Sequence, residues 1–477
     1  MAPKKSAITK SHDLAVEWVP VGALTVNPRN ARSHTDKQVR QLASAIRKLG
    51  FINPIIVDEG RMVLAGHCRL AAAKLLGAAR LPVIRVADLS EAEKRAYVLA
   101  DNRLAELAGW DRNLLAVEFQ YLTTPEIDFD VAITGFETRD IDLALASSAV
   151  TALDPLSDAV IEPSSGPAVS RLGDIWALGR HRLICGDARD AAVFAALLGN
   201  DAANMVFTDP PYNVAISGHA QGLGRIKHRD FVMATGELGR HQFTVFLGSA
   251  FANCAAHTTN GSIHFVFMDW RHLREILEAG TRVYGEPKNV CVWNKDNAGM
   301  GSFYRSKHEL VFVFKNGNAP HTNNFGLDEG GRYRTNVWDY PGVNTLKKGR
   351  ATELEMHPTV KPVALVIDAL KDCSHRNQTV LDPFVGSGTT IIAAEKAGRR
   401  AAGIELDPRY VDVALRRFIA VTGIAPTLIE TGQTFEAVAK CREAERTISA
   451  QATDASPLLR RRAPLVQSSR IKKGSQK

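Results

Sequence analysis

The sequence predicts an α/β protein of two domains, the second of which has a mainly parallel sheet with helices on both faces. The first observation is the length of 477 residues, which exceeds what one ordinary apolar core accommodates. The second is the run "TVLD", "PFVGSG", "TTIIAAEKAG" and "RRAAGIEL", which has the pattern of a strand, a glycine turn, a helix and a strand. The third is the alternation of short strands and helices before residue 110, which indicates a separate small α+β module.

The elements of this module, residues 15–110, follow from local signals. "TDKQVRQLASAIRKLG" places its apolar residues on one helical face and stops at Gly50. "PIIVDEGRMVLAG" predicts two short strands joined at residues 58–60. "SEAEKRAYVLADNRLAEL" begins with Ser90 and has Glu93 three residues later, which predicts a capping box at the start of a long helix.

The remaining boundaries follow from composition. Residues 111–170 are expected to form a helical segment and a linker, because periodicity is lost from Ala144 to Ser170 and Ser, Ala and Pro dominate. The second domain is expected at 171–425. Residues 426–477 are expected to be a basic tail, either a solvated end or an anchor for phosphates.

Composition also limits the class of protein. An apolar content of 45% is typical of globular proteins, and the net charge is +8. Six scattered cysteines without CxxC spacing favour neither a metal site nor a disulfide framework. No run of about 18 apolar residues occurs, so we expect a soluble, cytoplasmic protein that does not bind membranes.

The glycine turn predicts a nucleoside site. Gly386 and Gly388 allow a ligand to approach the backbone at a helix start, and Glu405 stands 19 residues after Gly386, where it can accept hydrogen bonds from ribose hydroxyls. The run lacks the lysine of a P-loop and the third glycine of a dinucleotide fingerprint. A ligand with a ribose and a small carboxylate, such as S-adenosylmethionine, therefore fits better than one with a pyrophosphate.

The stretch "TDPPYN", residues 208–213, is by itself only a strand end, because two prolines guarantee a turn. Its context is more specific. "TDPPYN", "HPTVKP", "DPFVGSGTT" and "GIELDPRYVDVALRR", in this order, resemble the amino-group DNA methyltransferases of the permuted class, over roughly residues 171–417. The resemblance implies a Rossmann-like, S-adenosylmethionine-dependent methyltransferase domain at 171–425, with the target-recognition region within 213–356.

The resemblance also implies roles for individual residues. Asp209 and the carbonyl of Pro210 would accept hydrogen bonds from the exocyclic amine of a flipped base, Pro211 would keep the turn rigid, and Tyr212 would stack on the base. The residues matched to the cofactor are Asp187, His357, Thr359, Lys361, Asp382, Phe384, Gly386, Ser387, Gly388 and Glu405. A helix cap remains an alternative role for Asp187, and a plain surface lysine for Lys361.

Within the target-recognition region, "GHAQGLGRIKHRD" and the residues Arg305, Lys307 and His308 are expected to contact DNA collectively. Phosphate contact, base reading and plain solvation stay open for each of these residues.

The N-terminal module resembles a second family. "NPRNAR", "GFINPIIVDEGRMVLAGHCRLAAAKLLG" and "ADNRLAEL" are similar to the N-terminal domain of ParB-like chromosome-partition proteins. In that family a Gly-x-x-Arg turn binds nucleotide phosphates, which implies a nucleotide site at Gly66, His67 and Arg69. Cys68 stands where a second arginine is common, so neither nucleotide hydrolysis nor a retained CTP site is expected, and the three residues are only a candidate site. No counterpart of the helix-turn-helix of partition proteins is expected after residue 110.

The function predicted is site-specific methylation of the N6 amine of adenine in double-stranded DNA, by a solitary modification enzyme in preference to one half of a restriction-modification pair. Asp209 favours adenine, because N4-cytosine enzymes of this type more often carry serine there. N4-cytosine methylation is the nearest alternative, and a ParB-like nucleotide-dependent DNA-binding factor with an inactive methyltransferase domain is another. RNA guanine methyltransferases usually place this motif after the cofactor turn, against the order found here. A homodimer stays open.

Overall fold

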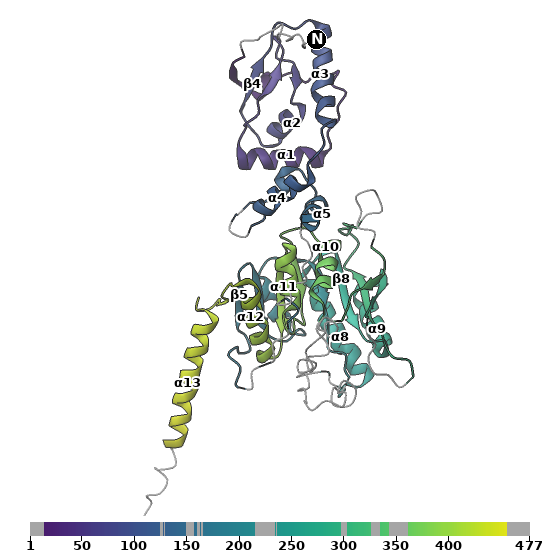
Figure 1. Cartoon of the computed structure of the whole chain (residues 1–477), viewed down its shortest axis with the longest axis vertical. Coiled ribbons are helices and arrows are strands. Elements are labelled where there is room, and N and C mark those ends of the chain that lie inside the picture. The colour runs from purple at the N-terminus through teal and green to yellow at the C-terminus, as the bar shows by residue number, and fades with distance from the viewer. Residues whose placement is uncertain are drawn as a thin grey trace, which may run out of the picture. The chain divides into compact units, whose positions relative to one another are not determined.

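The computed structural model describes residues 14–124, 127, 129–148, 157–159, 163, 166–214, 234, 236–296, 303–325, 334–342 and 361–455. The chain divides into two compact units, Met1–Ala152 and Leu153–Lys477. In Figure 1 the first unit is purple to blue, and the second continues through teal and green to yellow. Each unit has its own sheet and its own buried apolar clusters.

The described part of the first unit contains a four-stranded sheet in the order β1-β4-β2-β3. β4 runs antiparallel to β1 and parallel to β2, and β3 pairs antiparallel with β2. Ile55, Val57 and Val63 are fully buried there and pack with Leu70. The elements of this unit are β1 (Val16–Pro20), η1 (Val21–Ala23), α1 (Asp36–Leu49), β2 (Ile55–Val57), β3 (Val63–Ala65), α2 (His67–Leu75), β4 (Arg80–Arg85), α3 (Glu91–Glu106), α4 (Arg112–Leu122), η2 (Val131–Thr134) and α5 (Thr138–Ser148).

The local signals of this unit are confirmed. Helix α1 ends at Gly50, which has a φ of +83°. Asp58 accepts a hydrogen bond from the backbone N–H of Gly60 in the turn between β2 and β3. The capping box at the start of α3 is present, because Ser90 N–H donates to Oε2 of Glu93 at 2.8 Å.

Helices α4 and α5 belong to the same compact unit as this sheet. Phe119 of α4, Val131 of η2 and Ile141 of α5 form a small buried cluster. Further along, parts of the expected linker are bound to the second unit. The backbone N–H groups of Val169 and Ser170 both donate to the carboxylate of Asp412, at 2.6 and 2.9 Å.

The described part of the second unit contains a sheet of ten strands in the order β11-β9-β10-β8-β7-β12-β13-β6-β5-β14. Strands β8, β7, β12, β13 and β6 are parallel neighbours, whereas β10 runs antiparallel to β8 and β9. The strands are β5 (Ile175–Leu178), β6 (His181–Cys185), β7 (Ala203–Thr208), β8 (Thr258–Met268), β9 (Asn289–Asn294), β10 (His308–Lys315), β11 (Val337–Asp339), β12 (Thr379–Asp382), β13 (Arg400–Glu405) and β14 (Thr427–Leu428).

Helices cover both faces of this sheet. Helices α10, α11 and α12 pack with Phe265 and Phe267 of β8 on one face, and α8 and α9 pack with Val266 and Met268 on the other; α8 and α9 lie together beside the sheet in Figure 1. The prediction of an α/β domain with a mainly parallel sheet between two helical layers is confirmed. The helices are α6 (Ala191–Leu198), α8 (Arg240–Ala256), η3 (Trp270–His272), α9 (Leu273–Tyr284), α10 (Val363–Cys373), α11 (Thr389–Ala397), α12 (Pro408–Thr422) and α13 (Phe435–Ala455).

The order of the strands reverses between β7 and β12. From β7 the chain continues through α8 to β8, and from β12 it continues through α11 to β13 on the opposite side. The two connections therefore diverge, and in such sheets ligands bind in the crevice outside the carboxyl ends of the strands.

Residues 426–455, which the sequence assigned to a tail, form β14 and α13 (Figure 1). Phe435 and Val438 are buried in the main apolar cluster of the second unit. The first part of the expected tail therefore packs on this unit. The cluster of basic residues after 455 lies outside the described residues. Within the described part of the chain, none of the helices has both the length and the apolar content needed to cross a bilayer.

Candidate active site

Three acidic residues lie where neighbouring parallel strands end. Asp209 directly follows β7, Asp382 is the last residue of β12, and Glu405 is the last residue of β13. Since the carboxyl ends of parallel strands lie at one edge, the motif of residues 208–213 and the glycine turn come together. The hydroxyl of Thr208 donates to Oδ1 of Asp382 at 2.8 Å, although the two residues are 174 positions apart.

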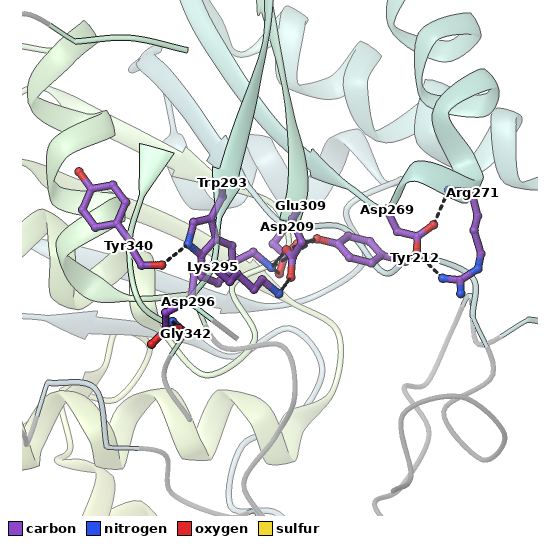
Figure 2. Close-up of polar contacts among 11 residues, drawn as sticks. Asp209, Tyr212, Asp269, Arg271, Trp293, Lys295, Asp296, Glu309, Tyr340 and Gly342 are labelled. Carbon is purple, nitrogen blue, oxygen red and sulfur yellow. Dashed lines mark hydrogen bonds and ion pairs between the residues drawn. The ribbon is translucent and has the colours of Figure 1, made fainter. Parts of the chain in front are cut away.

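Asp209 is bonded on both carboxylate oxygens. The hydroxyl of Tyr212 donates to its Oδ1 at 2.7 Å, and the ammonium of Lys361 donates to its Oδ2 at 2.6 Å. The same ammonium lies 2.9 Å from Oε2 of Glu309, and the Tyr212 hydroxyl lies 3.1 Å from that oxygen. Figure 2 shows Asp209, Tyr212 and Glu309 meeting in this network.

Sequence reasoning missed two members of this network, Glu309 and Lys295. Glu309 lies near the start of β10, and Lys295 directly follows β9, so the hairpin of these antiparallel strands brings them together. Lys295 donates to Oε1 of Glu309 (Figure 2), and its ammonium lies 4.5 Å from the ring centre of Trp293. The available signal was a carboxylate directly before the short apolar run "LVFVF", a pattern that is consistent with a buried strand.

Burial and ion pairing oppose each other here. Burial raises the pKa of Asp209, an effect that the positive charge of Lys361 reduces but does not cancel. Burial also acts to raise the pKa of Glu309, but Lys361 and Lys295 outweigh it and lower this pKa to about 2. Burial acts to lower the pKa of Lys361, and the two carboxylates raise it overall. Burial raises the pKa of Tyr212 well above its usual value, so its hydroxyl remains a hydrogen-bond donor.

The exit from β7 is held rigidly. Pro210 is buried and Pro211 is partly buried. Asn213 has a φ of +51°, its side-chain amide donates to the carbonyl of Leu238 at 2.8 Å, and its side-chain oxygen accepts from the N–H of Gly236 at 3.1 Å. Asp209 is thus held between strand β7, which precedes it, and the turn fixed by Asn213, which follows it.

The two glycines of the turn have different surroundings. Both have positive φ, +54° at Gly386 and +87° at Gly388. A Cβ at Gly388 would lie 3.0 Å from Cβ of Ala414 on α12, whereas one at Gly386 would meet no atom of the described residues within 4 Å. Gly388 therefore allows helices α11 and α12 to pack, and Gly386 borders open space. The N–H of Gly386 donates to Oε2 of Glu405 at 2.8 Å.

The carboxylates beside the turn are perturbed by burial. Burial raises the pKa of Asp382 to about 6, although Thr390, Thr208 and the N–H of Phe384 donate hydrogen bonds to it. Burial raises the pKa of Glu405 to about 7, against the effect of hydrogen bonds from the N–H groups of Asp407 and Gly386.

Aromatic packing and a buried arginine hold the other residues of the glycine turn. The Phe384 ring lies 5.8 Å from that of Phe246. The guanidinium of the buried Arg417 donates to the Ser387 carbonyl at 3.2 Å and to the Thr389 hydroxyl at 2.8 Å. Arg417 also donates to the carbonyl of Ser157 at 2.6 Å. A residue of the expected linker therefore bonds to the same guanidinium that holds the glycine turn.

Asp187 follows β6 and forms an ion pair with Arg189 at 2.6 Å. Helix α6 is capped by Asp190, which accepts from the N–H of Ala192 at 2.9 Å. A capping role for Asp187 is therefore excluded, and the residue lies at the same edge of the sheet as Glu405, because β6 and β13 are parallel neighbours.

Lys361 is not a surface lysine, because its side chain is only 5% exposed. His357 and Thr359 lie outside the described residues, as does the expected DNA-contacting loop "GHAQGLGRIKHRD". Among the described residues, no group of three or more His, Cys, Asp or Glu side chains is arranged to hold a metal ion.

In the first unit, Gly66 has a φ of +104° and precedes α2. Arg69 turns its guanidinium to the backbone carbonyls of Asn53 and Pro54, at 2.9 and 2.5 Å. Nε2 of His67 is buried and has no hydrogen-bond partner among the described residues.

A cavity of about 490 Å³ lies elsewhere in this unit, between the segment around Arg32 and helix α3. Its lining includes Asn102 and Arg103 but none of the three residues predicted to bind a nucleotide. The predicted nucleotide turn and this cavity are therefore separate features of the first unit.

Comparisons with known proteins match separate parts of the chain. The family model for a DNA methylase acting on N6 or N4 amines matches residues 203–416, the model for the ParB N-terminal domain matches residues 5–103, and the model for the ParB-methyltransferase HTH domain matches residues 113–172. The expectation that a helix-turn-helix counterpart is absent is thus wrong. Helices α4 and α5 are short, 11 residues each, and bury few apolar side chains, so their sequence pattern is faint.

Individual relatives agree with this division. The type II methyltransferase M.ScaI of Streptomyces caespitosus is 40% identical over 90 residues, 19% of this chain and 30% of that protein. The DNA adenine methyltransferase YhdJ of Escherichia coli (strain K12) is 27% identical over 250 residues, 46% of this chain and 76% of that protein. The ParB-like nuclease domain-containing protein YnaK of the same strain is 35% identical over 85 residues, 18% of this chain and 98% of that protein.

Among solved structures, the M1.HpyAVI-SAM complex is 21% identical with a TM-score of 0.36, covering 49% of this chain and 97% of that one. The match to M.ScaI thus spans less than a third of that relative's length, whereas the match to YhdJ spans about three quarters.

Proposed function

Because the chain belongs to the N6/N4 amino-group DNA methylases and carries a ParB-like N-terminal domain, we propose that it transfers a methyl group from S-adenosylmethionine to the exocyclic N6 amine of adenine in double-stranded DNA. The observation that carries this proposal is the position of Asp209 at the end of β7, joined through Thr208 to the glycine turn after β12. A carboxylate and a nucleoside-type turn then lie at the same edge of the sheet.

The exocyclic amine of adenine is a weak nucleophile, because its lone pair is delocalised into the ring. Asp209 accepts a hydrogen bond from this amine and the carbonyl of Pro210 accepts another, which directs the lone pair toward the methyl donor. Tyr212 stacks on the flipped base. The fixed turn around Pro210 and Asn213 keeps these groups in place without reorganisation during the reaction.

The residues of the glycine turn fit the cofactor. Gly386 borders open space, and Glu405 lies beside it with carboxylate oxygens that can accept from ribose hydroxyls. Asp187, Phe384, the helix start after Gly388 and Lys361 are proposed to complete the cofactor site. When bound, S-adenosylmethionine supplies an electrophilic methyl group on a sulfonium.

Adenine is proposed over cytosine for two reasons. Asp209 occupies the first position of the motif, where serine is more common in N4-cytosine enzymes, and a relative matched over 250 residues is a DNA adenine methyltransferase. N4-cytosine methylation is the alternative. The ParB-like and HTH parts of the first unit are proposed to bind DNA and to raise the affinity for the duplex.

The experiment is transfer of a labelled methyl group from S-adenosylmethionine to unmethylated DNA by wild type and by Asp209→Ala, with the modified base identified by mass spectrometry. We expect N6-methyladenine from wild type and a loss of about 10³-fold or more in Asp209→Ala. N4-methylcytosine instead would select the alternative. Absence of transfer together with absence of cofactor binding would overturn the proposal and favour a DNA-binding factor.

A further inference from the structure

A buried lysine lies between two carboxylates at the candidate active site. The ammonium of Lys361 is 2.6 Å from Oδ2 of Asp209 and 2.9 Å from Oε2 of Glu309. Its side chain is 5% exposed, so solvent does little to stabilise its charge and the two carboxylates must do so. In the proposed function, one of these two carboxylates, Asp209, must also bind the exocyclic amine of the target base.

In the structure, Lys361 holds an oxygen of Asp209 that the target amine requires. An ammonium bonded to this carboxylate weakens its hydrogen bond to the amine. It also places a positive charge next to a nitrogen that becomes positive as the methyl group arrives, which raises the energy of the transition state. Lys361 must therefore release Asp209 before methyl transfer.

Glu309 is in position to receive the lysine. Lys295 donates to Oε1 of Glu309 and leaves Oε2 directed at Lys361. The N–H of Lys295 donates to the carbonyl of Lys307 at 2.8 Å and closes the hairpin that carries both residues. Glu309 is thus held in place by its own hairpin, independently of Asp209.

Aromatic rings surround the ammonium of Lys361. Its Nζ lies 4.9 Å from the ring centre of Phe267, 5.5 Å from that of Tyr212 and 5.9 Å from that of Trp293. The negative faces of such rings attract a cation. They favour a charged lysine in this position whichever carboxylate it contacts, so moving from Asp209 to Glu309 does not require Lys361 to leave the site.

We propose that Glu309 is a positioning residue that draws Lys361 away from Asp209 when the target amine binds. In the substrate-free protein Lys361 caps Asp209, and during transfer it pairs with Glu309. This inference rests on the proposed methyl transfer, since it requires an amine that competes for Asp209.

The test compares single-turnover methyl transfer to unmethylated duplex DNA by wild type, Glu309→Gln, Lys361→Met and the double variant. Glu309→Gln keeps the shape and removes the charge, so Lys361 stays on Asp209 and we expect the rate constant to fall about tenfold. The dissociation constants for DNA and S-adenosylmethionine should stay within about twofold of wild type. Adding Lys361→Met to Glu309→Gln should restore about threefold or more of the rate, because Asp209 is released.

Such a recovery is not expected from a merely structural role, in which the second substitution would add to the loss. The matched control is Glu275→Gln, which removes a buried carboxylate paired with Arg240 at 2.7 Å on helices α8 and α9. Its transfer rate should equal that of wild type. If Glu309→Gln fails to fold, Glu309→Asp, which withdraws the carboxylate by one methylene, replaces it with the same expected order of rates.

An unchanged rate in Glu309→Gln, or a double variant no faster than Glu309→Gln, overturns this inference and leaves the proposed function intact. Wild type that transfers no methyl group overturns both, because no amine then competes for Asp209.

Discussion

The hydroxyl of Thr208 donates a 2.8 Å hydrogen bond to Oδ1 of Asp382. Thr208 ends β7 and Asp382 ends β12, and both side chains are buried. Asp382 also accepts from the hydroxyl of Thr390 at 2.6 Å and from the N–H of Phe384 at 3.1 Å. One carboxylate therefore connects the strand that carries Asp209, the glycine turn and the start of helix α11.

Replacing Thr208 by valine tests this connection. Thr208→Val keeps the shape of the side chain but leaves a buried oxygen of Asp382 without one donor, which should cost about 1–3 kcal/mol of the free energy of unfolding. Thermal and denaturant unfolding measure the loss. The control is Thr447→Val, since the hydroxyl of Thr447 bonds at an exposed position of α13 and its loss should cost less than about 0.5 kcal/mol. Equal losses in the two variants would contradict the connection.

Gly386→Ala and Gly388→Ala form a matched pair. At Gly388, alanine meets both an unfavourable φ of +87° and a Cβ contact of 3.0 Å with Ala414, so we expect a loss of stability of about 2 kcal/mol or more. At Gly386 none of the residues that the structure describes has an atom within 4 Å, and the backbone cost alone is about 1 kcal/mol.

The expected order is reversed for cofactor binding. A methyl group at Gly386 would occupy the space proposed for S-adenosylmethionine and weaken its binding about tenfold or more. Isothermal titration calorimetry and unfolding, applied to both variants, separate the two effects. Cofactor affinity in Gly386→Ala equal to that of wild type would place the ligand elsewhere.

The order of motifs was enough to predict which strand ends meet. Asp209, Asp382 and Glu405 each follow a short apolar run, and neighbouring parallel strands bring their carboxyl ends together, so sequence and topology agree. The capping box at Ser90 was equally predictable, because it depends on residues three positions apart.

Contacts that depend on register or on distant segments were not predictable. Glu309 reaches Lys361 only because β10 pairs antiparallel with β8 in one particular register, and no local pattern specifies that register. The residues around Ser157 have a composition typical of a linker, yet the Ser157 carbonyl accepts from the buried Arg417, 260 positions away. Composition does not report such backbone bonds.

Cofactor binding should depend on pH through Glu405. Burial raises the pKa of this carboxyl to about 7, and the ionised form accepts stronger hydrogen bonds from the ribose hydroxyls than the protonated form. Raising the pH through 7 ionises Glu405, so affinity for S-adenosylmethionine should rise and reach a plateau above that value. The dissociation constant at pH 6 is expected to be about tenfold larger than at pH 8.

Calorimetric titrations from pH 5.5 to 8.5 measure this dependence, and Glu405→Gln, which does not titrate, should bind more weakly and lose the dependence near pH 7. Asp382, whose pKa burial raises to about 6, is unchanged in this variant, so a dependence that remains near pH 6 is assigned to Asp382. A profile that keeps its slope in Glu405→Gln would assign the titration to another group.

Asp158 bonds to the start of helix α10. Its Oδ1 accepts from the N–H of Val363 at 3.0 Å, so it satisfies an N–H group at the first turn of α10, next to Lys361. A carboxylate at a helix N-terminus is also favoured by the helix dipole. Asp158→Ala should therefore cost about 1 kcal/mol in stability and, because Lys361 is then less firmly placed to pair with Glu309, slow single-turnover methyl transfer about threefold to tenfold.

Asp158→Asn keeps an acceptor oxygen and should retain most of the rate. Asp111→Ala is the control for capping alone, because Asp111 accepts from the N–H groups of Asn113 and Leu114 at the start of α4 in the first unit. It should lose similar stability with an unchanged rate per bound DNA. If Asp158→Ala and Asp111→Ala have the same transfer rate, Asp158 acts only as a helix cap, and the placement of Lys361 does not depend on the segment around Asp158.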